Sequence, residues 1–480
     1  MQPEHLKLGG GANATILHPI ALLALVIVSL LIVFARRKFI VTPFLLFAFL
    51  LPMSQQILVG GFHLYLLRIV ILIGVFRAIF SRNSGKEERL PGRIDAIDKV
   101  FMTWAAFHVI DFVVLFSFSI GALTNRLGYA WDVFGGYLIL RYAIQDDKDI
   151  DRVVKTFAVI TPIIAIGMLN EHFRMQNLFG ALGGFYTIPE VRDGAVRAQG
   201  PFAHSLLAGA FGATVLPLFF LLLIQGKARL LATVGAVSAF AMSVLAASST
   251  PLLTMAAGMF ALCLWPFRNQ MRVVRWGIVI ALISLNMIMK APVWMLIGHV
   301  SLMQGSSSDH RAYLVDMFIR HFDDWWLVGT NDAANWGWDM WDTSNQFVSE
   351  GENAGLVGFG CFIAMISICF SRIGKARQAV EGDRKREWRF WILGAALFSN
   401  VVAFFGISYF DQTQLMWFTL LIMITVGTAP SALAKRSAVV KRVTTKWNKA
   451  QIFAAGQSMG KHAKRGSAYD VGSQSKVRQS

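Results

Sequence analysis

The chain has 480 residues and a mean hydropathy of +0.54, with 55% hydrophobic and only 15% charged residues. Soluble domains carry about 25% charged residues, so this composition excludes a soluble enzyme held by a single anchor. Apolar runs of membrane-spanning length recur from Ile16 to Thr428, and they lack the two-residue alternation of an outer-membrane barrel. We expect an all-α, polytopic bundle of about twelve or thirteen transmembrane helices.

The formal net charge of +17 is concentrated near the C-terminal end. Residues 431–480 contain eleven Lys and Arg residues and one acidic residue, Asp470. We expect residues 1–430 to form a transmembrane domain and residues 431–480 to form a basic, disordered cytoplasmic tail on anionic membrane lipids. Binding to nucleic acid is the less favoured interpretation, because the tail has no recognisable nucleic-acid-binding fold.

Thirteen apolar segments are expected to cross the membrane. In chain order they are Ile16–Ala35, Phe39–Met53, Phe62–Phe80, Val100–Ala122, Leu127–Leu140, Val154–Leu169, Phe202–Ile224, Leu230–Ala246, Pro251–Trp265, Trp276–Ile297, Gly355–Phe370, Phe390–Phe410 and Leu415–Thr428. Every odd-numbered segment is followed by a loop rich in Lys and Arg, beginning with Arg36-Arg37-Lys38. Basic loops stay in the cytoplasm, so we expect the N-terminus outside and the C-terminus in the cytoplasm.

Two long segments, residues 170–201 and 298–354, then fall on the outer face. The second contains nine acidic residues, two arginines and five of the fourteen Trp residues. Such a loop can offer carboxylates for proton transfer and indole faces for stacking on sugars, although solvated acids and an interfacial Trp belt are the structural alternative. Within it, apolar residues at helical spacing predict an amphipathic helix over Ser308–Phe322, lying on the membrane surface.

The first candidate site leads from the shorter loop into the seventh apolar segment, as Arg192-Asp193-Gly194-Ala195-Val196-Arg197-Ala198-Gln199-Gly200-Pro201-Phe202-Ala203-His204. An arginine fixed at this depth presents a planar fork of donors suited to a phosphate or diphosphate. His204 is expected about one helical turn inside the segment. Alternatively, Arg197 extends to lipid headgroups and His204 is a packed helix residue.

The second candidate site returns the large loop to the membrane, as Trp338-Asp339-Met340-Trp341-Asp342-Thr343-Ser344-Asn345-Gln346-Phe347. Carboxylates and amides gathered at such a position can bind a sugar and remove a hydroxyl proton. The structural alternative is a capped helix start, with Asp342 or Thr343 as the N-cap.

Together the two segments resemble the bacterial O-antigen ligase and O-antigen polymerase superfamily of membrane glycosyltransferases. The residues that match in the first segment are Arg197, Gly200, Phe202 and His204. In the large loop the match continues, in order, through Ser306-Ser307-Ser308, Arg311, Val328-Gly329, Asn345-Gln346-Phe347 and Gly355-Leu356-Val357-Gly358. The resemblance covers residues 154–370 in detail and the remainder only by hydropathy.

In the resembling enzymes, a glycan is carried on a polyprenyl diphosphate at the outer face of the inner membrane, and an acceptor glycan or lipid attacks it. No metal or other cofactor takes part. The resemblance implies that Arg197 and Arg311 hold the diphosphate and stabilise its leaving charge. Asp342 is then the candidate base. Further contacts to the substrate are expected from His204, His310 and Asn345, with Trp336, Trp338 and Trp341 as sugar platforms.

The sequence departs from the family pattern at two positions. Ser344 stands where family members commonly have a histidine, so either Asp342, Asp309 or His310 replaces that base or no side chain carries out the deprotonation. The segment Ser248-Ser249-Thr250-Pro251 stands where the family tends to have Ser-Arg. Whether the enzyme is a polymerase or a ligase, and which sugars it uses, is left open by the sequence.

Ionisable residues within apolar segments support a second interpretation. His108 and Asp111 are three residues apart and share a helix face, and Arg68 and Lys290 lie in other apolar segments. Charged groups inside the membrane are typical of transport or proton-relay sites. The alternative function is therefore a secondary transporter of a polar solute, with a non-catalytic assembly protein as a third possibility.

Overall fold

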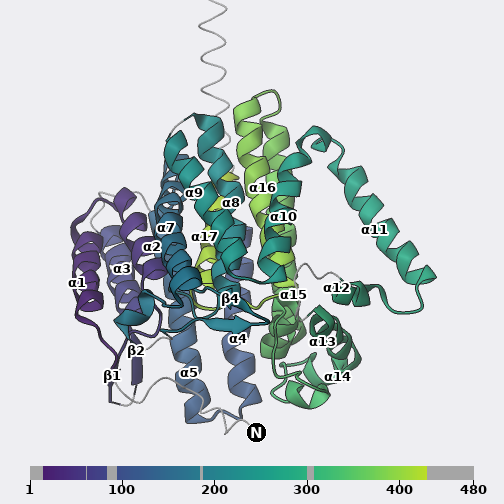
Figure 1. Cartoon of the computed structure of the whole chain (residues 1–480), viewed down its shortest axis with the longest axis horizontal. Coiled ribbons are helices and arrows are strands. Elements are labelled where there is room, and N and C mark those ends of the chain that lie inside the picture. Colours follow the sequence, from purple (N-terminus) through teal and green to yellow (C-terminus); the bar gives the residue numbers. More distant parts are fainter. Residues whose placement is uncertain are drawn as a thin grey trace, which may run out of the picture. The chain divides into compact units, whose positions relative to one another are not determined.

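The computed structural model describes residues 15–60, 62–83, 94–183, 187–226, 228–299 and 308–429 (Figure 1). The predicted basic tail, residues 431–480, and the Ser306-Ser307 pair lie outside the described residues. The described part is almost entirely helical and adds two antiparallel two-stranded sheets, β1–β2 and β3–β4. This architecture agrees with the expected all-α class.

The principal helices are numbered in chain order as in Figure 1. Their bounds are α1 Pro19–Phe34, α2 Val41–Leu50, α3 Leu66–Asn83, α4 Ala96–Leu115, α5 Ile120–Ala130, α6 Gly136–Ala143, α7 Asp147–Arg174, α8 Ser205–Gln225, α9 Arg229–Leu245, α10 Ser249–Cys263, α11 Met271–Ile288, α12 Leu296–His299, α13 Ser308–Arg320, α14 Phe322–Trp325, α15 Gln346–Ala379, α16 Arg384–Phe404 and α17 Asp411–Gly427. The strands are β1 Gln56–Val59, β2 Phe62–Tyr65, β3 Glu190–Arg192 and β4 Ala195–Arg197.

Four helices, α7, α8, α11 and α15, are long and apolar enough to cross a membrane. The remaining predicted spans also fall on helices, but several are divided. Residues 100–122 do not form one continuous helix, because α4 ends at Leu115 and Ser117 and Phe118 adopt positive φ angles of 51° and 55° before α5 begins. Residues 127–140 include a π-helical turn at Trp131–Gly135, and residues 62–65 form strand β2.

Helix α8 is the most buried of these four helices and packs against α7, α9, α10 and α16. Small residues permit this close packing. A Cβ atom added at Gly209 would lie 2.6 Å from the Cβ of Ala246, and one at Gly212 would lie 2.6 Å from the carbonyl oxygen of Ala239. Helix association in lipid depends on such close contacts, because there is no hydrophobic drive between helices. The bundle thus holds the beginning of α8 in a fixed position.

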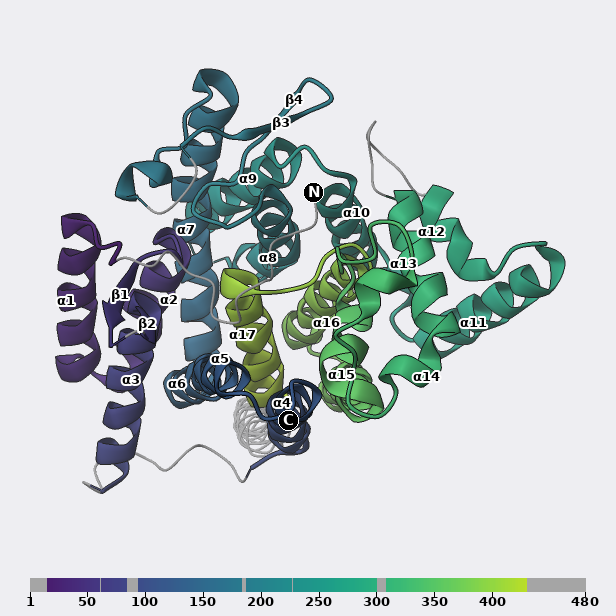
Figure 2. The same ribbon diagram turned by 90° about the horizontal axis from the view of Figure 1, so that it is seen from below.

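Helix α11 differs from the others because it has no buried residue. Its large apolar side chains are exposed on every face, and Met287 and Ile288 are more than 80% exposed. Both views show α11 at the edge of the protein, away from α8 and α9 (Figures 1 and 2). Its apolar surface therefore faces the surrounding medium on all sides, as expected of a helix immersed in lipid.

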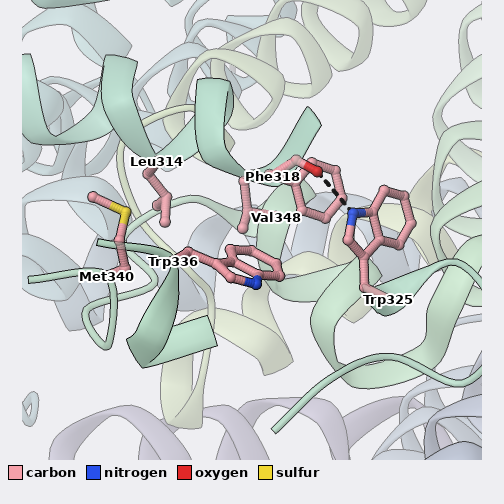
Figure 3. Packing of buried hydrophobic residues seen from close by; sticks show 6 residues of the cluster. All are labelled: Leu314, Phe318, Trp325, Trp336, Met340 and Val348. Carbon is pink, nitrogen blue, oxygen red and sulfur yellow. Dashed lines mark hydrogen bonds between the residues drawn. The ribbon is translucent and has the colours of Figure 1, made fainter. Parts of the chain in front are cut away.

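The large loop between α11 and α15 has a small hydrophobic core of its own (Figure 3). The side chains that form it are Leu314, Phe318, Trp325, Trp336, Met340 and Val348. The rings of Phe318 and Trp325 stack with centroids 4.0 Å apart, and the indole N–H of Trp325 donates to the carbonyl oxygen of Phe318. The apolar residues Leu314 and Phe318 of α13 thus pack inside the loop, and do not face a membrane surface as expected.

Helix α15 contains a sharp kink that joins this loop to the bundle. Ala354 and Gly355 leave helical geometry, and Gly355 has a φ of 54°. A Cβ atom at Gly355 would lie 2.5 Å from the carbonyl oxygen of Leu327, while the backbone N–H of Leu356 donates to Trp326. Only glycine fits this approach. The kink thereby fixes the residues after α14 against α15.

Candidate functional site

A cavity of about 600 Å³ opens where the β3–β4 hairpin, the beginning of α8 and helix α13 meet. The turn between α9 and α10, residues 342–344 and the loop between α16 and α17 complete its walls. Its charged and imidazole side chains are Glu190, Arg192, Asp193, Arg197, His204, Arg311 and Asp342. Four residues selected from the sequence, Arg197, His204, Arg311 and Asp342, therefore line one cavity although they come from three separate segments.

Arg197 is placed by a tight hairpin. Asp193 and Gly194 have φ angles of 50° and 77°, as a two-residue type I′ turn requires, and the strand register puts Glu190 directly opposite Arg197. One terminal nitrogen of the Arg197 guanidinium lies 3.1 Å from each carboxylate oxygen of Glu190. The Arg197 side chain is buried, whereas that of Glu190 is 48% exposed. Arg197 is therefore not a freely extended headgroup anchor, because a neighbouring carboxylate holds it.

A second set of contacts fixes the backbone that follows Arg197. The buried carboxylate of Glu171, in α7, accepts hydrogen bonds from the backbone N–H groups of Gln199 and Gly200, at 2.6 and 2.8 Å. The side-chain amide of Asn177 donates to the carbonyl oxygen of Gly200 at 2.9 Å. Gly200 itself has a φ of 60°. These bonds hold the segment rigidly where it enters α8.

His204 is the N-cap of α8, and so it does not lie one turn inside the helix as expected. Its Nδ1 atom accepts from the backbone N–H of Leu206 at 3.2 Å, and its Nε2 atom lies 3.9 Å from Glu190. Burial, and then the nearby Arg197 charge, lower the pKa of His204 below its usual value. A neutral imidazole suits this position, because the capping nitrogen must keep its lone pair.

Arg311 reaches the cavity from α13 and is buried. Within the described residues it forms no ion pair, and its Nε atom has no hydrogen-bond partner. Burial lowers the pKa of Arg311 to about 10; nearby Asp342 opposes this change, and Arg192 and Arg197 add to it. The guanidinium remains charged at neutral pH. Two buried cations thus share one cavity, whose acidic residues are more exposed.

Asp342 is exposed at the cavity wall, and its neighbours hold the segment in place. The imidazole Nε2 of His310 lies 2.9 Å from the carbonyl oxygen of Asp342, so His310 contacts the backbone and does not line the cavity. Thr343 donates to the buried carboxylate of Glu352 at 2.8 Å, and the hydroxyl of Ser408 donates to the carbonyl oxygen of Thr343. The Asp342 carboxylate is thereby directed by a fixed backbone.

Two residues predicted to contact substrate have structural roles. Asn345 is fully buried and is the N-cap of α15, where its side-chain oxygen accepts from the N–H groups of Phe347 and Val348. The cap is therefore neither Asp342 nor Thr343. Trp336 is buried in the loop core, stacks on His321 and donates to Asp324, so it presents no free face to a sugar.

Trp338 and Trp341 are 90% and 72% exposed, and neither lines the cavity. Both are available to a large ligand that extends beyond the cavity, but a small ligand inside it would not touch them. Besides the imidazole of His204, the only aromatic ring among the lining residues described is Phe410, from the loop between α16 and α17.

The residues proposed for a transport site have different ion-pair partners. His108 lies 2.7 Å from Glu350, which also accepts from Trp104. Arg68 forms a two-pronged ion pair with Asp132. Lys290 follows the end of α11 and is exposed, outside the helix in which it was expected. His108 and Arg68 therefore pair with different carboxylates, although both lie close to residues 128–129 of α5: the rings of His108 and Tyr129 are 5.9 Å apart, and a Cβ atom at Gly128 would lie 2.8 Å from the Arg68 guanidinium.

Glu190 is the functional candidate that the sequence analysis missed. The sequence does contain the pattern that predicts its position. The dipeptide Asp193-Gly194 between alternating residues is a strong indicator of a β-hairpin, and such a hairpin fixes which residue lies opposite Arg197.

In the described part of the chain, no group of three or more His, Cys, Asp or Glu residues is arranged to hold a metal ion. The sequence matches no protein-family model, no curated protein and no solved structure.

Proposed function

We propose that the protein is a membrane glycosyltransferase that uses a glycan linked to polyprenyl diphosphate as its donor. The observation that supports this most strongly is the meeting of Arg197 and Arg311, two buried arginines 114 positions apart in the chain, in one cavity of about 600 Å³ with Asp342. Buried cations require an anion. A diphosphate supplies two neighbouring phosphates, which fits two planar guanidinium forks.

The reaction we propose is a direct displacement. The oxygen of an acceptor hydroxyl bonds to the anomeric carbon, and the bond from that carbon to the diphosphate oxygen breaks with its electron pair left on the diphosphate. The acceptor proton moves to the carboxylate of Asp342, which is exposed at the cavity wall. Arg197 and Arg311 stabilise the charge that the departing diphosphate gains.

The proposal includes membership of the O-antigen ligase and polymerase superfamily, thirteen membrane crossings and an outer-face location of the cavity. The order of basic loops supports this orientation. The serines at positions 248 and 249, where the family tends to have Ser-Arg, also line the cavity, so this departure from the family pattern falls at the proposed site. The acceptor is a glycan or a lipid.

The test is transfer by the full-length protein in nanodiscs. The donor is the polyprenyl-diphosphate-linked glycan extracted from a strain that lacks the gene, and released polyprenyl diphosphate is measured by mass spectrometry with a chelator present. We expect wild-type protein and the Arg320→Lys control to release it, and Arg197→Lys to release none. Arg320 is a fair control because its side chain is 65% exposed on the same helix as Arg311.

Two results would overturn the proposal. One is a deletion strain that accumulates no lipid-linked glycan and keeps its surface polysaccharide. The other is solute uptake by proteoliposomes that contain the purified protein but show no glycan transfer. The second result would favour the transporter alternative and direct attention to the buried pair of His108 and Glu350.

A further inference from the structure

We infer that Glu190 is an internal counter-ion that the diphosphate displaces from Arg197, and that its return to Arg197 expels the diphosphate product. This inference rests on the proposed function and concerns the same cavity. It assigns a role to a carboxylate that lines the cavity but is not needed for the chemical step.

The contact geometry shows why Glu190 and an anionic ligand compete. Both carboxylate oxygens of Glu190 lie 3.1 Å from the same terminal nitrogen of Arg197, and this carboxylate forms part of the cavity wall. Among the described residues, Glu190 is the only carboxylate that forms an ion pair with Arg197. A phosphate oxygen that binds this nitrogen therefore competes with the Glu190 carboxylate.

Exposure determines which of the two partners moves. The Arg197 side chain is only 6% exposed and precedes a segment fixed by Glu171, whereas the Glu190 side chain is 48% exposed. The displaced carboxylate also has a nearby destination, because one of its oxygens lies 3.9 Å from the Nε2 atom of His204. Glu190 can therefore rotate away into water or toward His204 while Arg197 remains in place.

The advantage of this exchange comes after the chemical step. When the bond to the sugar breaks, the departing diphosphate gains negative charge and binds two buried arginines more tightly than the donor did. Tight product binding would slow turnover, since product release limits many enzymes. A tethered carboxylate that can reoccupy Arg197 offers an intramolecular competitor at high effective concentration.

The test uses inorganic pyrophosphate as the probe, with full-length protein in nanodiscs of uncharged phosphatidylcholine. We expect Glu190→Gln to bind pyrophosphate about tenfold more tightly than wild type, the low end of the effect of removing a charged hydrogen bond. The gain in affinity should come from slower dissociation, measured as the loss of bound labelled pyrophosphate after excess unlabelled pyrophosphate is added. The charge-matched control is Asp193→Asn, in the turn of the same hairpin, where Asp193 lies 3.9 Å from Arg192 and has no contact with Arg197.

The possible outcomes distinguish the role inferred for Glu190 from the proposed function. A gain in Glu190→Gln that Asp193→Asn does not reproduce supports the inference. Equal or weaker binding by Glu190→Gln overturns it, as does an equal gain in Asp193→Asn, and the proposed function then still stands. Tighter binding through faster association alone overturns product expulsion. If neither wild type nor Glu190→Gln binds pyrophosphate, the proposed function itself falls.

Discussion

Glu171 in α7 and Gly200 before α8 are joined by a 2.8 Å hydrogen bond from the glycine N–H to a buried carboxylate oxygen, while the second oxygen accepts from Gln199. A carboxylate can accept both bonds because it carries no hydrogen. Neither Glu171 nor Gly200 lines the cavity. Their pairing nevertheless determines where the Arg197 backbone lies.

Replacement of Glu171 by Gln should therefore weaken anion binding without touching the cavity. The amide NH₂ would face one backbone N–H, leaving a buried donor unsatisfied at a cost of about 1–3 kcal/mol. We expect a lower melting temperature and weaker pyrophosphate binding, measured by thermal unfolding and calorimetry. Asp323→Asn, at an exposed site in α14, is the matched control. Unchanged pyrophosphate binding by Glu171→Gln would show that this clamp does not position Arg197.

Lysine substitutions test whether the arginines act through geometry or through charge alone. Arg197→Lys and Arg311→Lys each keep the charge but lose the planar fork. We expect each to reduce transfer by at least about 10²-fold, as loss of a donor to a developing charge typically does. Membrane insertion should be normal in both variants. Near-normal glycan products from both variants would exclude a diphosphate clamp.

His204 should make the protein less stable in acid. Its folded-state pKa is lowered by burial and by Arg197, so the unfolded chain binds more protons as the pH falls below about 6.5. The stability is present above this pH and is lost as the pH falls through the lowered pKa. His204→Asn keeps a capping oxygen but cannot titrate. We expect its melting temperature to vary less between pH 7 and pH 5 than that of wild type; parallel curves would contradict the assignment.

Topology can be tested by labelling single cysteines after the native cysteines, Cys263, Cys361 and Cys369, are replaced. Asp323→Cys in α14 and Lys385→Cys in α16 are both exposed positions. We expect an impermeant maleimide to label position 323 in intact cells and position 385 only after permeabilisation. The reverse pattern would place the cavity on the cytoplasmic side and rule out an outer-face donor.

Substitutions of the tryptophans in the large loop should affect stability according to how deeply each side chain is buried. Trp336→Ala would open a cavity in the loop core and should cost about 3–5 kcal/mol. Trp338→Ala removes a side chain that is 90% exposed and should leave stability unchanged. Thermal unfolding and proteolysis of the loop provide the measurements. If Trp338→Ala reduced transfer while leaving stability intact, a long glycan would be shown to extend beyond the cavity.

Much of the fold could be predicted because membrane helices are encoded locally, in runs of apolar residues. The break after α4 could not, since Ser117 and Phe118 carry no turn signal and adopt positive φ only in their tertiary setting. Likewise, the pairing of His108 with Glu350 could not be predicted, because Glu350 lies 242 residues further along the chain. Hydropathy does not reveal such long-range pairs.

The charged residues of the candidate site could be predicted from the sequence, but the structural roles of the residues around them could not. Arg197 stands out as an arginine beside an apolar segment and Arg311 as an arginine of an amphipathic helix, and both line the cavity. Trp336 and Asn345, which were expected to contact substrate, are a buried core indole and a helix cap, and composition does not distinguish such residues from a binding residue. Glu190 could have been predicted from the Asp193-Gly194 turn, because a two-residue hairpin turn at that position places Glu190 opposite Arg197 on the neighbouring strand.

Helix α11, with no buried side chain, experiences a different kind of sequence constraint from α8. In α8 a single added methyl group at Gly212 would collide with a neighbouring backbone, so shape decides which residues are accepted. Around α11 fluid lipid adapts to any outline, so only apolarity and length matter. Over evolutionary time, α11 can therefore exchange Leu, Ile, Val and Met freely, whereas α8 must conserve its small residues.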